Sequence, residues 1–93
     1  MNTIETLRSH LDTLQREYGV KSIGVFGSAA RGEAGASSDV DLLVHFEAEN
    51  FKNFMSFCIY VENLLGKRVD VIPQSGRLSA QFLNAIKEDL IRI

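Results

Sequence analysis

Apolar residues near the start of the chain recur at spacings of three and four, the pattern of a helix with one buried face. The recurring positions are Ile4, Leu7, Leu11, Leu14 and Tyr18. Gly19 follows them, and glycine commonly ends a helix because it adopts the left-handed backbone conformation. The pattern therefore predicts a surface helix over residues 4–18 that packs one face on a core.

Two stretches rich in β-branched and aromatic residues, 20–26 and 39–46, predict the first two strands. The segment between them is made of turn-forming residues and is too short for a crossover with its own helix, so we expect antiparallel strands. Alternation along the second strand separates two sets of side chains. One face would carry Val40, Leu42 and Val44, and the other Asp39, Asp41 and Leu43.

The remaining chain predicts a helix, a strand and a closing helix, over residues 51–65, 67–72 and 78–90. Gly66 ends the first helix, and Pro73 blocks continuation of the strand. Ser79 or Ser75 is the candidate cap of the closing helix. The helix between the second and third strands is long enough for a parallel crossover.

These elements predict an α+β (α/β-like) fold in a single domain spanning residues 1–93. Their order is α-β-turn-β-α-β-α, and we expect a small mixed sheet with the helices packed on one face. The helix over 51–65 has more apolar residues than one stripe requires. The expected buried stripe is Phe51, Phe54, Met55, Cys58, Val61 and Leu65, which leaves out Phe57, Tyr60 and Leu64. Either the helix is covered on two sides, or the surplus residues contact another protein.

Charge and composition exclude several classes of function. Twelve acidic residues against ten basic ones give a net charge of −2, which does not favour binding to a nucleic-acid backbone. No apolar run approaches the roughly 18 residues of a membrane span. The single cysteine cannot form an internal disulfide, so we expect a reducing, cytoplasmic environment.

Acidic residues on the second and third strands are the strongest candidates for chemistry. Asp39 and Asp41 leave the same face of a strand, about 6.6 Å apart along the backbone. Their repulsion would raise the pKa of at least one carboxyl, and divalent cations could bridge them. Asp70 alternates with two valines and joins the same face if the valines face the helices. Carboxylate oxygens are the ligands that Mg²⁺ prefers, so the three acids predict a magnesium site.

The small-residue loop before these acids is a candidate phosphate site. Gly27 lets the backbone approach a phosphate closely, and the following amides and the Ser28 hydroxyl can donate hydrogen bonds. Arg31 could contact a phosphate, or form a structural ion pair with Asp39 or Glu33. Both interpretations of Arg31 stay open from the sequence.

One motif in the chain resembles the signature of the DNA polymerase β-type nucleotidyltransferase superfamily. It consists of Gly27-Ser28, ten further residues and then Asp39-Val40-Asp41. The spacing, with residues 30–32 and Ser38, is similar to the minimal nucleotidyltransferase branch, which includes antitoxins paired with HEPN-domain ribonuclease toxins.

This resemblance implies ATP as donor, two Mg²⁺ ions, and an adenylylated tyrosine on a HEPN-type toxin as product. It implies catalytic and metal-binding roles for Asp39, Asp41 and Asp70, and nucleotide-binding roles for Gly27, Ser28, Arg31 and Ser38. Self-association is a further expectation from the surplus apolar residues. The alternative function is a catalytically weak binding module that neutralises its partner by occlusion.

Overall fold

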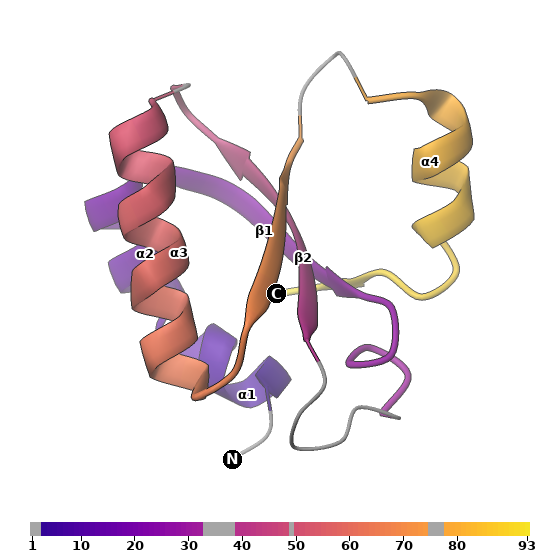
Figure 1. The fold of residues 1–93 in the computed structure, drawn as a ribbon, viewed down its shortest axis with the longest axis horizontal. Helices are drawn as coiled ribbons and strands as arrows, with labels where there is room; N and C mark the ends of the chain where they lie inside the picture. Colours follow the sequence, from indigo (N-terminus) through magenta and orange to yellow (C-terminus); the bar gives the residue numbers. More distant parts are fainter. Residues whose placement is uncertain (1–2, 33–38, 49, 75–77) are drawn as a thin grey trace.

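The computed structural model describes residues 3–32, 39–48, 50–74 and 78–93. Four helices and four strands follow one another in the described chain (Figure 1). Their bounds are α1 Thr3–Ser9, α2 Leu11–Tyr18, β1 Val20–Phe26, β2 Val40–Phe46, α3 Phe51–Leu65, β3 Val69–Pro73, α4 Ala80–Ile86 and β4 Ile91–Arg92. The strands form one sheet in the order β3-β2-β1-β4.

The pairing of the first three strands agrees with the prediction. β1 is antiparallel to β2, and β2 is parallel to β3, so the sheet is mixed. The short strand β4 was not predicted, and it pairs antiparallel with β1 through Gly24 and Val25. The expected α+β fold class is confirmed, with one strand more than the sequence indicates.

The predicted N-terminal helix is two helices. His10 separates α1 from α2, with φ −109° and ψ 6°. Its Nδ1 atom lies 2.9 Å from the carbonyl oxygen of Thr6. The closing helix is also shorter than predicted. Ser79 caps it by accepting a hydrogen bond from the Phe82 amide, whereas Ser75 lies outside the described residues.

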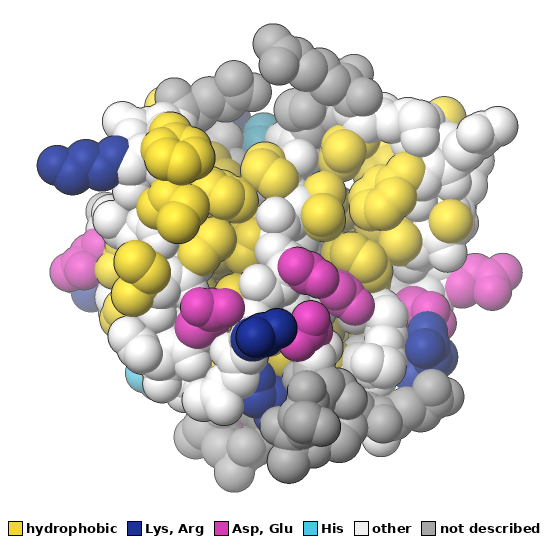
Figure 2. All heavy atoms as spheres, in the orientation of Figure 1, with side chains coloured by type: hydrophobic (Ala, Val, Ile, Leu, Met, Phe, Trp, Pro, Cys, Tyr) yellow, Lys and Arg dark blue, Asp and Glu magenta, His cyan; other side chains and the backbone are white. Residues whose placement is uncertain are grey.

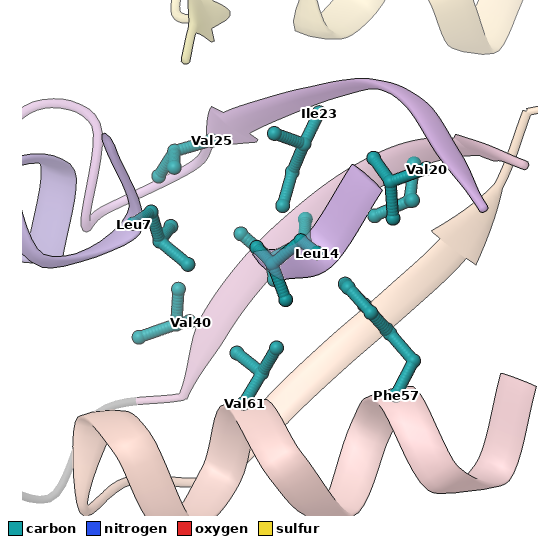
Figure 3. Packing of buried hydrophobic residues seen from close by; sticks show 10 residues of the cluster. Leu7, Leu14, Val20, Ile23, Val25, Val40, Phe57 and Val61 are labelled. Carbon is teal, nitrogen blue, oxygen red and sulfur yellow. The ribbon is translucent and has the colours of Figure 1, made fainter. Parts of the chain in front are cut away.

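The core lies between one face of the sheet and helices α1 to α3 (Figure 3). Its buried members are Leu7, Leu14, Val20, Ile23, Val25, Val40, Leu42, Val44, Phe57 and Val61. Helix α4 instead lies across the opposite face of the sheet (Figure 1), where Phe82 meets Phe26 edge to face at a centroid distance of 6.1 Å. The expectation that all helices pack on one face is therefore wrong for α4.

The buried face of α3 also differs from the predicted stripe. Phe57 is fully buried, and its ring meets those of Tyr18 and Phe46 edge to face at 6.0 and 5.2 Å. The exposed apolar residues of this helix are Phe51, Met55 and Ile59, at 79%, 42% and 56%. The prediction chose a face rotated from the true one, because an almost wholly apolar helix has no polar side to fix its orientation. None of the described helices combines the length and the apolar character needed to cross a membrane.

Candidate active site

The candidate site lies on the face of the sheet opposite helices α1 to α3. Phe26, Asp41 and Asp70 are Cα partners across β1, β2 and β3, so they form one row across the sheet. Val40 and Leu42, on either side of Asp41, are fully buried against the helices, which directs Asp41 to the other face. Figure 2 shows acidic side chains gathered near the lower part of β2, with hydrophobic side chains over α3 on one side and over α4 on the other.

Gly27 brings the turn after β1 into direct contact with Asp41. A Cβ atom at Gly27 would lie only 2.5 Å from Asp41 Oδ2, and the φ of Gly27 is +74°. Both the close approach and the backbone conformation therefore require glycine. The amides of Ala30 and Arg31 donate to the Gly27 carbonyl oxygen at 3.1 and 3.2 Å, which closes a single tight turn that contains Ser28. The predicted phosphate loop and the predicted acidic site thus meet.

The electrostatics of the row centre on Asp41. Burial is the largest cause that raises the pKa of its carboxyl, followed by the charges of Asp70 and then Asp39. Repulsion between these carboxylates is relieved by a proton or by a cation. Within the described part of the chain, no three His, Cys, Asp or Glu side chains converge as closely as the ligands of one metal ion must. Carboxylate oxygens are nevertheless the ligand type that Mg²⁺ prefers, so the donor set fits this ion chemically.

The remaining predicted residues have different placements. Asp39 is exposed and directly precedes β2, while Asp70 is exposed on β3. Ser38 and Glu33 lie outside the described residues. The structure thus brings together Gly27, Asp41 and Asp70, with Ser28 in the adjoining turn.

Arg31 forms an ion pair that the sequence did not predict. Its Nη1 atom lies 2.7 Å from Asp89 Oδ2, in the turn after α4. The structural interpretation of Arg31 expected Asp39 or Glu33 as the partner. Asp89 is a partner that it did not name, and Glu33 lies outside the described residues. No spacing in the sequence could indicate this contact, because 58 positions separate the two residues. The ion pair ties the segment after α4 to the turn that follows Gly27.

Exchange of the charges of Arg31 and Asp89 tests whether Arg31 has a structural role or contacts a phosphate. We expect Arg31→Asp alone to lower the free energy of unfolding by no more than about 1 kcal/mol, because the pair is partly exposed. The double variant Arg31→Asp/Asp89→Arg should recover that loss in urea unfolding. If it also recovers the affinity for Mg²⁺-ATP, then Arg31 acts through its ion pair with Asp89 and not through a contact with the nucleotide. A stable double variant that binds ATP weakly would instead show that the guanidinium contacts the nucleotide.

Comparison with known proteins places this chain in a family. The model of the nucleotidyltransferase domain family matches residues 7–93. The chain belongs to the nucleotidyltransferase domain family. It is 41% identical over 93 residues to the protein adenylyltransferase MntA of Thermococcus cleftensis, covering 95% of this chain and 94% of that protein.

Solved structures agree with this assignment. A structure assigned as a minimal nucleotidyltransferase superposes with a TM-score of 0.78 and 35% identity, over 100% of this chain and 97% of the other. A toxin-antitoxin crystal structure with AMP-PNP shares the fold, with a TM-score of 0.71 and 17% identity over 90% of this chain and 69% of that chain. The expected enzyme class, a nucleotidyltransferase, is confirmed.

Proposed function

We propose that this chain transfers AMP from ATP to a hydroxyl group, and that the acceptor is a tyrosine of a partner toxin of the HEPN ribonuclease class. The observation that carries the proposal is the position of Asp41, between the Gly27 turn and Asp70 on one exposed sheet face. The names of the relative and of the toxin-antitoxin structure support adenylyl transfer and a toxin partner.

Asp39, Asp41 and Asp70 are the residues that would hold two Mg²⁺ ions. When bound, such ions neutralise charge on the triphosphate and make the acceptor oxygen more acidic. The raised pKa of Asp41 fits this role, because a cation removes the repulsion that raises it. Backbone amides after Gly27 and the Ser28 hydroxyl would bind phosphate oxygens and hold the triphosphate in line for transfer.

The transfer forms a bond between the acceptor oxygen and the α-phosphorus and breaks the bond from that phosphorus to the oxygen that bridges it to the β-phosphorus. Pyrophosphate leaves, and the hydroxyl proton passes to the Asp70 carboxylate, which acts as general base. Asp70 is exposed on β3, an edge strand of the sheet. A protein-borne hydroxyl can therefore approach it from outside the sheet.

The test combines the purified chain with Mg²⁺, each nucleoside triphosphate in turn, and the product of a neighbouring gene that encodes a HEPN-type protein. We expect the intact mass of the partner to increase by one or more adenylyl groups with ATP, and peptide mapping to place them on tyrosine. Omission of Mg²⁺ should abolish the increase, because the three carboxylates would then repel the triphosphate. A partner that is neutralised without any change in mass would favour the alternative function, occlusion by a binding module.

A further inference from the structure

The open face of the sheet carries a second row of residues beside the acidic one. Gly24, Leu43 and Ile72 are Cα partners across β1, β2 and β3. Each lies two positions along its strand from the row of Phe26, Asp41 and Asp70, which is about 6.6 Å away along the strands. An apolar strip of sheet therefore borders the proposed phosphate and metal site.

Helix α4 stands over this strip and leaves a cavity of about 190 Å³, here called the α4 cavity. Its apolar wall is formed by residues of the sheet and of the α4 segment, including Gly24, Leu43, Leu83 and Leu90. No residue of α4 is fully buried. Leu43 is 6% exposed and Leu90 lies directly over Gly24, so the α4 segment covers part of the strip and leaves the cavity beside it.

The size of the α4 cavity limits its occupant. An apolar cavity of about 150 Å³ accommodates a benzene ring, whereas pockets for whole drug-sized ligands begin at roughly 300 Å³. A volume of about 190 Å³ therefore fits one flat ring system and not a whole nucleotide. Ser22, Gln74 and Asn84 also line the cavity, and their polar groups could pair with the edge of a heterocycle. Lys87 and Arg92 line it as well and add positive charge.

The position of the α4 cavity indicates which ring occupies it. The sheet residues that line the cavity are Ser22, Ile23 and Gly24 of β1 and Leu43 of β2, so the cavity extends along β1 away from the Gly27 turn. Gln74, which follows β3, also lines it, whereas Asp70 lies near the opposite end of β3. Contacts of Arg31 with Asp89 and of Phe26 with Phe82 fix the α4 segment beside the same turn. Gly24 precedes Gly27 by three residues, which is about 10 Å of strand and within the span of an extended nucleoside triphosphate. A triphosphate bound at that turn can therefore reach the cavity with its nucleoside, while the acceptor approaches from Asp70.

We propose that the α4 cavity receives the nucleobase of the donor nucleoside triphosphate, an inference that rests on the proposed transfer from ATP. Leu83 contacts one face of the base, and the amide of Asn84 pairs with its edge. The base completes the packing beneath α4. Its burial increases the affinity for ATP, because contacts with the charged phosphates alone are weak on a solvent-exposed sheet. The cavity therefore also determines which base the enzyme accepts.

The test compares ATP with inorganic tripolyphosphate, which lacks the base, in titrations of the full chain followed by heteronuclear NMR with Mg²⁺ present. Leu83→Trp fills the cavity, and we expect it to weaken ATP binding about tenfold or more, because the indole ring occupies the volume that the base requires. Its affinity for tripolyphosphate should stay within about twofold of wild type. Gln81→Ala is the matched control, because Gln81 is an exposed amide of α4 that does not line the cavity.

A second variant and a photoaffinity label test the inference even if Leu83→Trp does not fold. Asn84→Ala removes an exposed amide, and it should reduce the preference for ATP over GTP and CTP. Light-activated 8-azido-ATP should label residues of the α4 segment in the wild-type chain. Equal affinity of the wild type for ATP and tripolyphosphate, or labelling only elsewhere, would overturn the inference.

Two further outcomes separate this inference from the proposed function. If Leu83→Trp keeps its ATP affinity but raises the KM of the acceptor protein, the cavity binds the acceptor, and the inference is wrong while the transfer reaction stands. If the wild-type chain binds neither ATP nor tripolyphosphate, the proposed function fails, and the inference fails with it.

Discussion

Asp41→Asn is expected to reduce AMP transfer about a hundredfold or more while the fold stays intact. Asp41 occupies the centre of the acidic row, with Asp70 beside it and its Oδ2 atom packed on Gly27. The amide keeps the shape of the carboxylate but removes the charge that would hold Mg²⁺ against the triphosphate. Single-turnover transfer to the partner protein measures the loss. Asp12→Asn, at an exposed surface ion pair, should leave the rate unchanged.

The same substitution has an opposite effect on the stability of the metal-free protein. Burial and the charges of Asp70 and Asp39 raise the pKa of Asp41 above its ordinary value of 3.8 in the folded state. A raised pKa stabilises the fold below the unfolded pKa, and this contribution is lost as the pH rises through the folded pKa. At neutral pH the ionised Asp41 therefore destabilises the fold relative to asparagine.

Urea unfolding in the presence of EDTA between pH 4 and pH 8 tests this effect. The wild-type free energy of unfolding should fall more steeply with rising pH than that of Asp41→Asn, and the variant should be the more stable at pH 7. Mg²⁺ should stabilise the wild type more than the variant. A variant that is less stable than wild type at pH 7 without metal would contradict the repulsion between the acids.

The sequence predicts the positions of the acidic residues in the row because these positions depend on residues that are close together along the chain. Alternation along β2 determines the side of Asp41, and the two valines that flank Asp70 do the same for β3. The short connection between β1 and β2 requires antiparallel pairing, which brings Gly27 beside Asp41. Each step uses only spacing within a strand or the length of a loop, so the shared face of Asp41 and Asp70 could be predicted once the two valines are assumed to face the helices.

The sequence does not predict on which face of the sheet the α4 segment packs. Its apolar residues fit packing on either face of the sheet, and the choice depends on contacts distant in sequence, such as Phe26 with Phe82 and Arg31 with Asp89. The strand β4 has two residues, too few to show alternation. The α4 cavity arises from these same long-range contacts, so spacing along the chain gives no indication of it.

The buried face of helix α3 could not be predicted from the sequence either. Its sequence has apolar residues on nearly every side, so periodicity allows more than one buried stripe. The structure selects the face of Phe57 and Val61, because Tyr18 of α2 and Phe46 of β2 close around the Phe57 ring. Phe57, which the sequence pattern left outside the expected buried stripe, is one of the largest members of the core.

Phe57→Ala is accordingly expected to lower the free energy of unfolding by about 3–5 kcal/mol, the usual cost of deleting a buried phenyl ring. Domains of this size are typically stable by about 5–15 kcal/mol, so the variant should lose a large share of its stability. Ile59→Ala, on the exposed side of the same helix, removes an apolar side chain that is 56% exposed and should change stability by about 0.5 kcal/mol or less. Urea unfolding at pH 7 measures both, and equal losses for the two variants would show that α3 buries a different face.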